Sequence, residues 1–156
     1  MKETGKPSKT LEQKRAAKAW AHVNEIVSEI KKKEDTKSKL GENYRSGVRK
    51  APAMIKTNGL GQTLAFLLSK EEKKAVDARN NPEKPEGYLY KHLEEWLCGG
   101  EAPIPWPPEL KDKPLVERVM EVDSTIYLQA TQEALAYLGW LKRFAEACFG
   151  KSKGGG

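Results

Sequence analysis

Apolar residues recur at intervals of three and four positions over most of the chain, which is the spacing of one face of an α-helix. The first run of this kind covers about residues 11–34. Thr10 precedes the run and Gln13 stands three positions later, the spacing of a capping box. We therefore predict a first helix over residues 11–34 with Thr10 as its N-cap. The apolar residues of this helix are Ala16, Ala19, Trp20, Val23, Ile26, Val27 and Ile30.

A second predicted helix, over about residues 40–58, carries an apolar stripe and a basic ridge. On a helical wheel Arg45, Arg49 and Lys56 fall within about 40° of one another, roughly 100° from the stripe. Pro52 interrupts the pattern, so either the helix is kinked there or a new helix begins there. The stripe consists of Tyr44, Val48, Ala51 and Ile55.

The pair Asn58-Gly59 predicts the end of this helix, since glycine adopts the left-handed C-cap conformation without a steric penalty. The next predicted helix covers about residues 60–74. It is apolar nearly all round over residues 64–68, which is typical of a centrally buried helix. Residues 77–87 have the composition of turns and loops.

The sequence predicts an all-α protein with a single compact multi-helix domain of about six helices. No strand pattern of convincing length and no internal repeat is present. The domain is expected to span residues 11–149, with a flexible tail over residues 1–10 and a disordered tail over residues 150–156. The remaining predicted helices cover about residues 88–98, 114–122 and 124–149, the last with Asp123 or Ser124 as its cap.

A proline-rich loop over residues 101–114 separates two of these helices. Five prolines in this stretch exclude a helix or a central strand. The loop carries Trp106, which either binds a partner or covers a hydrophobic groove of its own domain. We favour the second alternative because an exposed tryptophan lowers solubility.

The composition is that of a small cytoplasmic protein. The 156 residues suit one domain with one core. No stretch approaches the roughly 18 consecutive apolar residues of a membrane span, and residues 1–10 lack the apolar core of a signal peptide. Cys98 and Cys148 form no metal-binding spacing and are expected to be reduced, buried small hydrophobes.

The sequence offers no set of catalytic residues. His22 and His92 have no second histidine or cysteine at ligand spacing. His22 and Glu25 stand three apart on a helix, which is common and nonspecific. No phosphate-binding glycine loop occurs, because the Gly59-Leu-Gly61 pair follows a helix rather than a strand. We therefore predict a protein without enzymatic activity, metal, cofactor or small-molecule substrate.

The net charge of +6 is unevenly distributed along the chain. Residues 1–56 contain 15 Lys and Arg against 7 Asp and Glu, which gives +8, so the remaining residues carry −2. Such a basic segment on a near-neutral body indicates a surface for a polyanion, although lysine-rich helices can also be merely solvated.

Four sequence blocks together resemble one known family, the small helical subunit of the type III-B CRISPR effector, or Cmr complex. The resemblance spans about residues 11–149, and the proline loop around Trp106 stands outside it. The blocks are Arg15-Ala-Ala-Lys-Ala-Trp20; Pro52-Ala-Met-Ile55 with Asn58-Gly-Leu-Gly-Gln62 and Leu64-Ala-Phe66; His92-Leu-Glu-Glu-Trp-Leu97; and Thr131-Gln-Glu-Ala-Leu135 with Trp140-Leu-Lys-Arg-Phe-Ala-Glu-Ala147.

The resemblance implies a non-catalytic subunit of an antiviral effector. Copies of such a subunit stack in the interior of the complex, beside the subunits that hold the guide RNA, and contact guide and target RNA. Contacts of this kind are made to the RNA backbone and are independent of sequence. The expected contact residues are Lys14, Lys18, Arg45, Arg49, Lys56 and Arg143.

Several residues of these blocks have structural alternatives. Arg15 either faces RNA or is a partly buried arginine paired with an acid such as Glu133. Trp140 and Arg143 either form a stacking platform for a base or belong to the core and its rim. The residues expected in the core are Leu60, Leu64, Phe66, Trp96, Leu135 and Phe144.

The alternative function is that of a purely structural bridging subunit. In that case the basic surface meets acidic patches on other subunits, and the protein alone has negligible affinity for RNA.

Overall fold

The computed structural model describes residues 8–33, 39–72 and 74–150. These residues form helices and connecting loops with no strand, which confirms the all-α prediction. The expected tails lie largely outside the described residues, over 1–7 and 151–156. The helices are α1 (Leu11–Lys33), α2 (Leu40–Asn58), α3 (Leu60–Ser69), α4 (Ala75–Asn80), α5 (Pro85–Leu97), a 3₁₀ turn η1 (Pro108–Leu110), α6 (Leu115–Glu121) and α7 (Ser124–Phe149).

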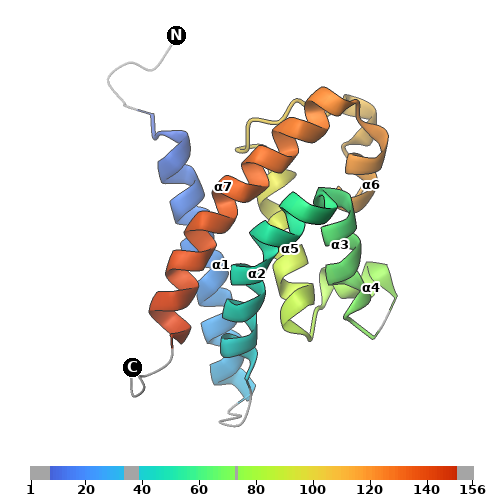
Figure 1. Cartoon of the computed structure of the whole chain (residues 1–156). Helices are drawn as coiled ribbons and strands as arrows, with labels where there is room; N and C mark the ends of the chain where they lie inside the picture. Colours follow the sequence, from blue (N-terminus) through green and yellow to red (C-terminus); the bar gives the residue numbers. More distant parts are fainter. Residues whose placement is uncertain (1–7, 34–38, 73, 151–156) are drawn as a thin grey trace.

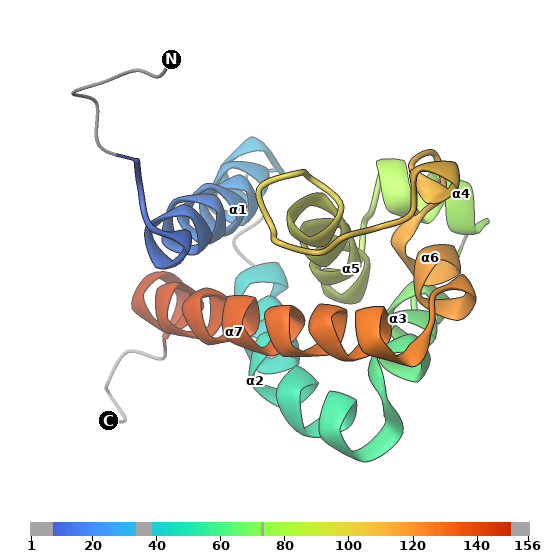
Figure 2. The ribbon, with the colours of Figure 1, turned by 90° about the horizontal axis from the view of Figure 1, so that it is seen from above.

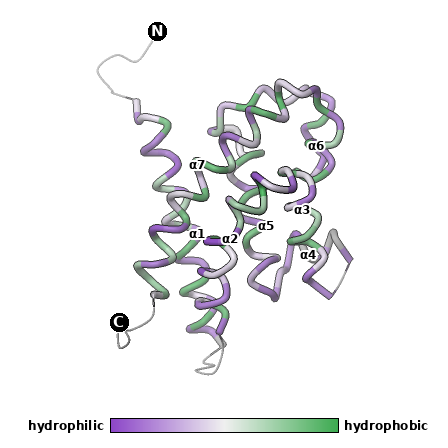
Figure 3. The backbone as a smooth tube through the Cα atoms, viewed as in Figure 1, coloured by the Kyte–Doolittle hydropathy of each residue, from purple (hydrophilic) through white to green (hydrophobic). Residues whose placement is uncertain are grey.

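The long C-terminal helix α7 organises the fold (Figure 1). Its most extensive contacts are with α1 and α2, and it also packs on α5. Seen from above, α1 lies on one side of α7 and the second half of α2 on the other (Figure 2). Hydrophobic and hydrophilic positions alternate along these helices, as their amphipathic sequences require (Figure 3).

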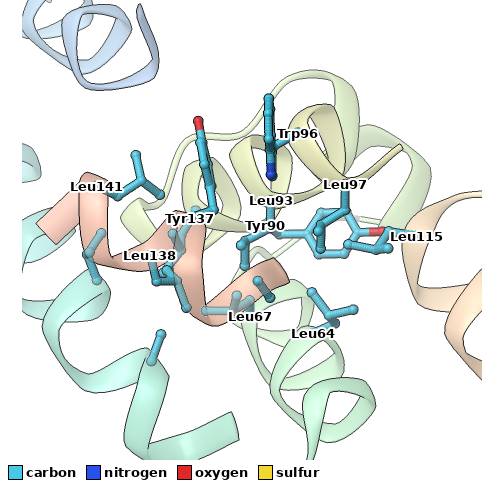
Figure 4. Close-up of a cluster of buried hydrophobic side chains, with 14 of the residues drawn as sticks. Leu64, Leu67, Tyr90, Leu93, Trp96, Leu97, Leu115, Tyr137, Leu138 and Leu141 are labelled. Atoms are coloured by element: carbon cyan, nitrogen blue, oxygen red, sulfur yellow. The ribbon is translucent and has the colours of Figure 1, made fainter. Parts of the chain in front are cut away.

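The core is built from large aromatic and aliphatic side chains of α1, α2, α3, α5, α6 and α7. Trp96 and Tyr137 stack face to face with ring centroids 5.2 Å apart (Figure 4). Other fully buried side chains are Tyr44, Tyr90, Ile26, Leu60, Leu64, Leu89, Leu93, Leu97, Leu115 and Leu138. Figure 4 shows how side chains from several helices meet around Tyr90, Leu93 and Leu138.

Three predicted helix starts are confirmed by the structure. The backbone N–H of Gln13 donates to Thr10 Oγ1 at 3.0 Å, and the backbone N–H of Thr10 donates to Gln13 Oε1 at 2.8 Å, so the capping box is formed. The carboxylate of Asp123 accepts from the backbone N–H of Ile126 at 3.0 Å and caps α7. Leu60 begins α3 as predicted.

Helix α2 runs through Pro52 without a break, so no new helix begins there. The axis of α2 changes direction partway along its length (Figure 2), as expected where proline removes a helical hydrogen bond. Of the two alternatives that the sequence left open, the kinked helix is the correct one.

The boundaries predicted around residues 60–87 are wrong. Helix α3 ends at Ser69 instead of Lys74, and a short additional helix, α4, occupies part of the predicted loop. Helix α5 begins at Pro85, three residues before the predicted start. Proline is well tolerated in the first turn of a helix, because its missing N–H would have no partner there.

The carboxylate of Glu71 secures the start of α5. Its Oε2 accepts from the backbone N–H groups of Glu83 at 2.9 Å and Lys84 at 2.6 Å. A Cβ atom on Gly87 would lie 2.0 Å from the same oxygen, so glycine at this position makes room for the buried carboxylate.

Gly59 joins α2 to α3 in a conformation that differs from the predicted left-handed cap. Its φ of 94° is positive as expected, but its ψ of 158° places it in a region that only glycine populates readily. A Cβ atom there would lie 3.3 Å from the hydroxyl of Tyr127, which accepts from the backbone N–H of Gly61 at 2.9 Å.

We expect the Gly59→Ala substitution to lower the free energy of unfolding by about 1–3 kcal/mol, because alanine is strained in this backbone conformation. Urea denaturation followed by circular dichroism measures the change. Gly139→Ala is the matched control: Gly139 lies within a helix and its added Cβ would meet nothing within 4 Å. Equal effects of the two substitutions would contradict the strain argument.

Two apolar residues of the predicted helices lie at the surface, and one of them, Phe66, was expected in the core. Trp20 is 49% exposed, and its ring meets that of Phe144 on α7 in an edge contact. Phe66 is 39% exposed on the outer side of α3 and is covered by the ammonium group of Lys70, 5.0 Å from its ring centroid. Helix α3 is therefore buried on one face rather than centrally, and Leu135 and Phe144 are only partly buried.

The proline-rich loop packs on its own domain, as favoured from the sequence. Ala102 and Ile104 are buried, and the indole N–H of Trp106 donates to the carbonyl oxygen of Leu97 at 2.9 Å. The guanidinium of Arg118 lies 5.4 Å from the Trp106 ring centroid. The loop thus covers the C-terminal end of α5. Within the described part of the chain, no helix combines the length and apolarity needed to cross a bilayer.

Candidate nucleic-acid interface

Three of the predicted RNA-binding residues share one side of α2, and we call Arg45, Arg49 and Lys56 the α2 flank. Arg49 is 54% exposed, and its Nε lies 3.9 Å from the carboxylate of Glu146 on α7. Arg45 is half-buried, and its Nε has no hydrogen-bond partner among the described residues. Lys56 is exposed in the last turn of α2. The flank therefore presents cations that are at most weakly neutralised by the protein itself.

Lys14 and Lys18 occupy a different part of the surface. They stand one turn apart on α1, and Lys18 lines a hollow formed with α5 and with the segment that precedes α6. No residue of the α2 flank lines this hollow. Of the flank, Lys56 belongs to the second half of α2, which lies across α7 from α1 (Figure 2).

Arg143 lies on the exposed side of α7, beside Trp140. The two side chains line one hollow of about 370 Å³ together with Glu12, Ala136 and Gly139. The ring of Trp140 packs on Phe144, with centroids 5.7 Å apart. The structure thus brings together Trp140 and Arg143, the two residues considered as a stacking platform for a base. Glu12 adds a negative charge beside them.

Arg15 has the structural role that the sequence offered as one of two alternatives. Its Nε and Nη2 donate to the two carboxylate oxygens of Glu133 at 2.6 and 2.8 Å. Glu133 is buried, with 5% exposure, and also accepts from the indole N–H of Trp96 at 2.9 Å. This triad ties α1, α5 and α7 together, and it raises the pKa of Arg15 chiefly through the hydrogen bond to Glu133.

The two histidines form a buried network that the sequence analysis missed. The rings of His22 on α1 and His92 on α5 stack with centroids 4.1 Å apart. His22 Nε2 lies 2.9 Å from Glu95 Oε1, and His92 Nε2 lies 2.8 Å from Glu25 Oε1. Each helix therefore contributes a histidine followed three positions later by a glutamate, and each histidine pairs with the other helix's glutamate.

Each histidine also meets a tyrosine at its other ring nitrogen. His92 Nδ1 lies 2.7 Å from the hydroxyl of Tyr44, and His22 Nδ1 is hydrogen-bonded to the hydroxyl of Tyr137. The ammonium group of Lys91 lies between the two glutamates, 2.9 Å from Glu25 and 3.3 Å from Glu95. We call these seven residues the histidine network; it joins α1, α2, α5 and α7.

The charges of the network follow from its geometry. The hydrogen bond to His92 lowers the pKa of Glu25 to about 2, and that to His22 lowers the pKa of Glu95 to about 2. Burial lowers the pKa of His92 to about 4 and also lowers that of His22. Both rings are thus neutral near pH 7: Nε2–H donates to a carboxylate, and Nδ1 accepts from a tyrosine hydroxyl. Every ring nitrogen is satisfied, which indicates a structural role.

A sequence signal for this network existed in the two H-x-x-E patterns at His22 and His92. Each pattern is common on helices, and only the packing of α1 against α5 shows that the pairs cross. In the described part of the chain, no group of three or more His, Cys, Asp or Glu side chains could hold a metal ion.

The cysteines differ from each other in their surroundings. Cys98 is partly buried, and burial raises the pKa of its thiol to about 12. Cys148 is exposed in the last turn of α7, so the prediction that both are buried is wrong for Cys148. The apolar arc of α7 loses its cover at this end of the helix, because only one side of the last turn meets the core.

Two comparisons place the chain beside known proteins. A family model described as CRISPR-associated protein (Cas_Cmr5) matches residues 11–148. The chain is also similar to a CRISPR-associated Cmr5 family protein from Thermus thermophilus, known from an X-ray crystal structure. The two are 27% identical with a TM-score of 0.55, and the match covers 91% of this chain and 99% of that chain.

Proposed function

The chain belongs to the CRISPR-associated Cmr5 family, the small subunits of type III-B Cmr effector complexes, and on this premise we propose that it binds RNA without catalysing a reaction. In this role the protein stacks with copies of itself and with other subunits in the interior of the complex. It contacts the backbone of guide and target RNA, and it acts in the cytoplasm.

The α2 flank is the observation that carries this proposal. Three cations on one side of a helix suit sequence-independent contacts to phosphates spaced along a strand. The described residues offer them a single carboxylate, Glu146, at 3.9 Å from Arg49. Exposed ion pairs of this length contribute little, so the guanidinium group of Arg49 is available to phosphate.

The absence of a reactive centre in the described residues supports a non-catalytic role. The buried titratable side chains of the histidine network are engaged with one another, and Glu133 is engaged by Arg15 and Trp96. A general base or nucleophile needs a free position next to a substrate, and these groups have none.

We expect the double substitution Arg45→Glu with Arg49→Glu to weaken target-RNA binding by the assembled complex, with a deficit roughly ten-fold larger at 50 mM than at 200 mM salt. Each phosphate contact contributes about half a decade of affinity over the range from 50 to 200 mM salt. Filter binding with a guide-complementary RNA measures the loss, and circular dichroism tests that the helices are intact. RNA binding equal to that of the wild-type complex would show that the α2 flank is not an RNA contact.

Exposed apolar side chains favour a second candidate function, that of a bridging subunit with negligible RNA affinity of its own. Trp20, Met120 and Leu128 are 49%, 70% and 55% exposed, and such residues are common where proteins meet. In this case the Arg45→Glu, Arg49→Glu protein would fail to join the complex. Unaltered assembly with impaired RNA binding would decide for the RNA-contacting role.

A further inference from the structure

A second group of cations converges where α1, α5 and the segment before α6 meet. The hollow at this place has a volume of about 380 Å³. Its cationic lining comes from separate parts of the chain. These side chains are Lys18 of α1, Arg79 of α4, Lys111 and Lys113 of the preceding segment, and Arg118 of α6.

Two of the three acids that line this hollow, Glu94 and Glu95, are already bound to other groups. Glu94 accepts from Arg79 Nη2 at 2.9 Å, and also from the Tyr90 hydroxyl at 2.9 Å and the backbone N–H of Leu115 at 2.6 Å. Glu95 belongs to the histidine network. The third acid, Asp112, is exposed.

The lysines of the hollow have little to neutralise them. Lys18 and Lys111 form no ion pair among the described residues, and Lys113 Nζ lies 3.9 Å from Glu117, in an exposed pair. Three ammonium groups therefore surround the hollow without a strong counter-charge.

Arg118 holds the two loop lysines in place. Its side chain is buried, with 6% exposure for the residue, and donates from Nε to the carbonyl oxygen of Lys113 at 2.8 Å and from Nη2 to that of Lys111 at 2.6 Å. The indole of Trp106 covers the guanidinium. These hydrogen bonds fix the backbone on both sides of Asp112. The two lysines are therefore attached to a rigid backbone, and the segment loses less conformational entropy on binding.

We propose that this hollow binds the phosphate backbone of single-stranded RNA through Lys18, Lys111 and Lys113. The inference rests on the proposed function and adds a contact surface that includes no residue of the α2 flank. Lysine acts as a compact point charge toward phosphate, which suits contacts without base recognition. Lys14 extends the site along α1, about 6 Å from Lys18 along the helix axis.

The test uses a full-length double variant that carries both Lys111→Gln and Lys113→Gln, and compares it with the wild type. Fluorescence anisotropy with a labelled single-stranded RNA is recorded from 50 to 200 mM salt. Two lost phosphate contacts reduce the slope of log affinity against log salt by about 1.4, at about 0.7 per contact. The deficit of the variant is therefore roughly seven-fold larger at 50 mM than at 200 mM salt.

Two further variants separate the possible outcomes. Lys31→Gln with Lys32→Gln removes the same charge from exposed positions at the other end of α1 and is expected to keep the wild-type slope. Arg45→Gln with Arg49→Gln reports on the α2 flank alone. If the Lys111, Lys113 variant keeps the wild-type slope of log affinity against log salt while the Arg45, Arg49 variant has a reduced slope, the hollow is not an RNA site and the proposed function stands. The reverse result shows that the α2 flank is not an RNA contact and leaves the hollow as the RNA site.

The remaining outcomes concern the nature of the partner. Poly-glutamate serves as the probe for an acidic protein segment. If the protein binds poly-glutamate through Lys111 and Lys113 and does not bind RNA at 50 mM salt, the proposal is wrong. The hollow is then a site for an acidic protein segment. RNA binding that poly-glutamate does not displace at equal charge concentration supports it.

Discussion

Replacing Arg15 by alanine is expected to lower the free energy of unfolding by about 3 kcal/mol, at the lower end of the range for breaking a buried ion pair. The substitution leaves the buried carboxylate of Glu133 with a single neutral donor, the indole N–H of Trp96. The lower end applies because the Arg15 side chain is itself 20% exposed, so water reaches the pair. For a chain of this size, the midpoint of thermal unfolding should fall by roughly 6–12 °C.

Two further substitutions test the cause of this loss. Lys14→Ala removes a cation from the adjacent position of α1 and should change the melting midpoint by less than about 2 °C, as is usual for surface positions. Arg15→Lys keeps the charge but not the two parallel hydrogen bonds, so an intermediate loss is expected. Equal midpoints for Arg15→Ala and Lys14→Ala would mean that the pair does not stabilise the fold.

Acidification from pH 7 to pH 4 is expected to destabilise the protein through the histidine network by roughly 3 kcal/mol. The pKa of His92 is about 4 in the folded protein, against an ordinary value of 6.5, because burial disfavours the imidazolium. The unfolded chain therefore binds more protons between these values. Stability is fully present above about pH 6.5 and is lost as the pH falls toward 4.

The glutamates of the network act in the same direction at lower pH. The pKa of Glu25 and of Glu95 is about 2 in the folded protein, against 4.5 ordinarily. Their contribution is present above pH 4.5 and is lost as the pH falls from there toward 2. Two stacked imidazolium rings 4.1 Å apart would also repel each other, so both histidines cannot be charged without opening the core.

Thermal unfolding by calorimetry at pH 7, 6, 5 and 4 measures this dependence. The double variant Tyr44→Phe with His92→Leu removes the titrating ring without leaving the Tyr44 hydroxyl unpaired. The midpoint of thermal unfolding of this variant should fall less between pH 7 and pH 5 than that of the wild type. A wild-type midpoint that stays constant from pH 7 to pH 4.5 would contradict the assignment of two neutral buried histidines.

Local patterns predicted the helices well where they carried their own start and stop signals. The Thr10–Gln13 capping box and the helix break at Gly59 follow from the sequence, and Asp123 is one of the two caps that the sequence allows for α7. The boundaries around residues 70–87 do not follow from it, because they depend on Glu71 reaching across to the backbone of residues 83 and 84. The spacing of apolar residues in the sequence does not predict a hydrogen bond from the backbone to a distant side chain such as that of Glu71.

The exposure of aromatic residues also depended on packing. Trp20 follows the apolar spacing of α1, yet α7 covers only one edge of its ring. Arg15 and Glu133 could be paired from the sequence as one of two alternatives, because an arginine beside an apolar stripe needs an acid. The crossed histidine–glutamate pairs of the histidine network could not be predicted from the sequence, because they depend on how α1 and α5 are rotated relative to each other.

The partners of α1 also have a consequence for synthesis of the chain. Arg15 pairs with Glu133 and His22 pairs with Tyr137, so these two side chains of the first helix find these partners only when the last helix is made. At translation rates of about 5–20 residues per second, the nascent α1 stays unpaired for on the order of 10 s. A ribosome that stalls before residue 137 therefore displays an N-terminal helix that lacks its partners on α7.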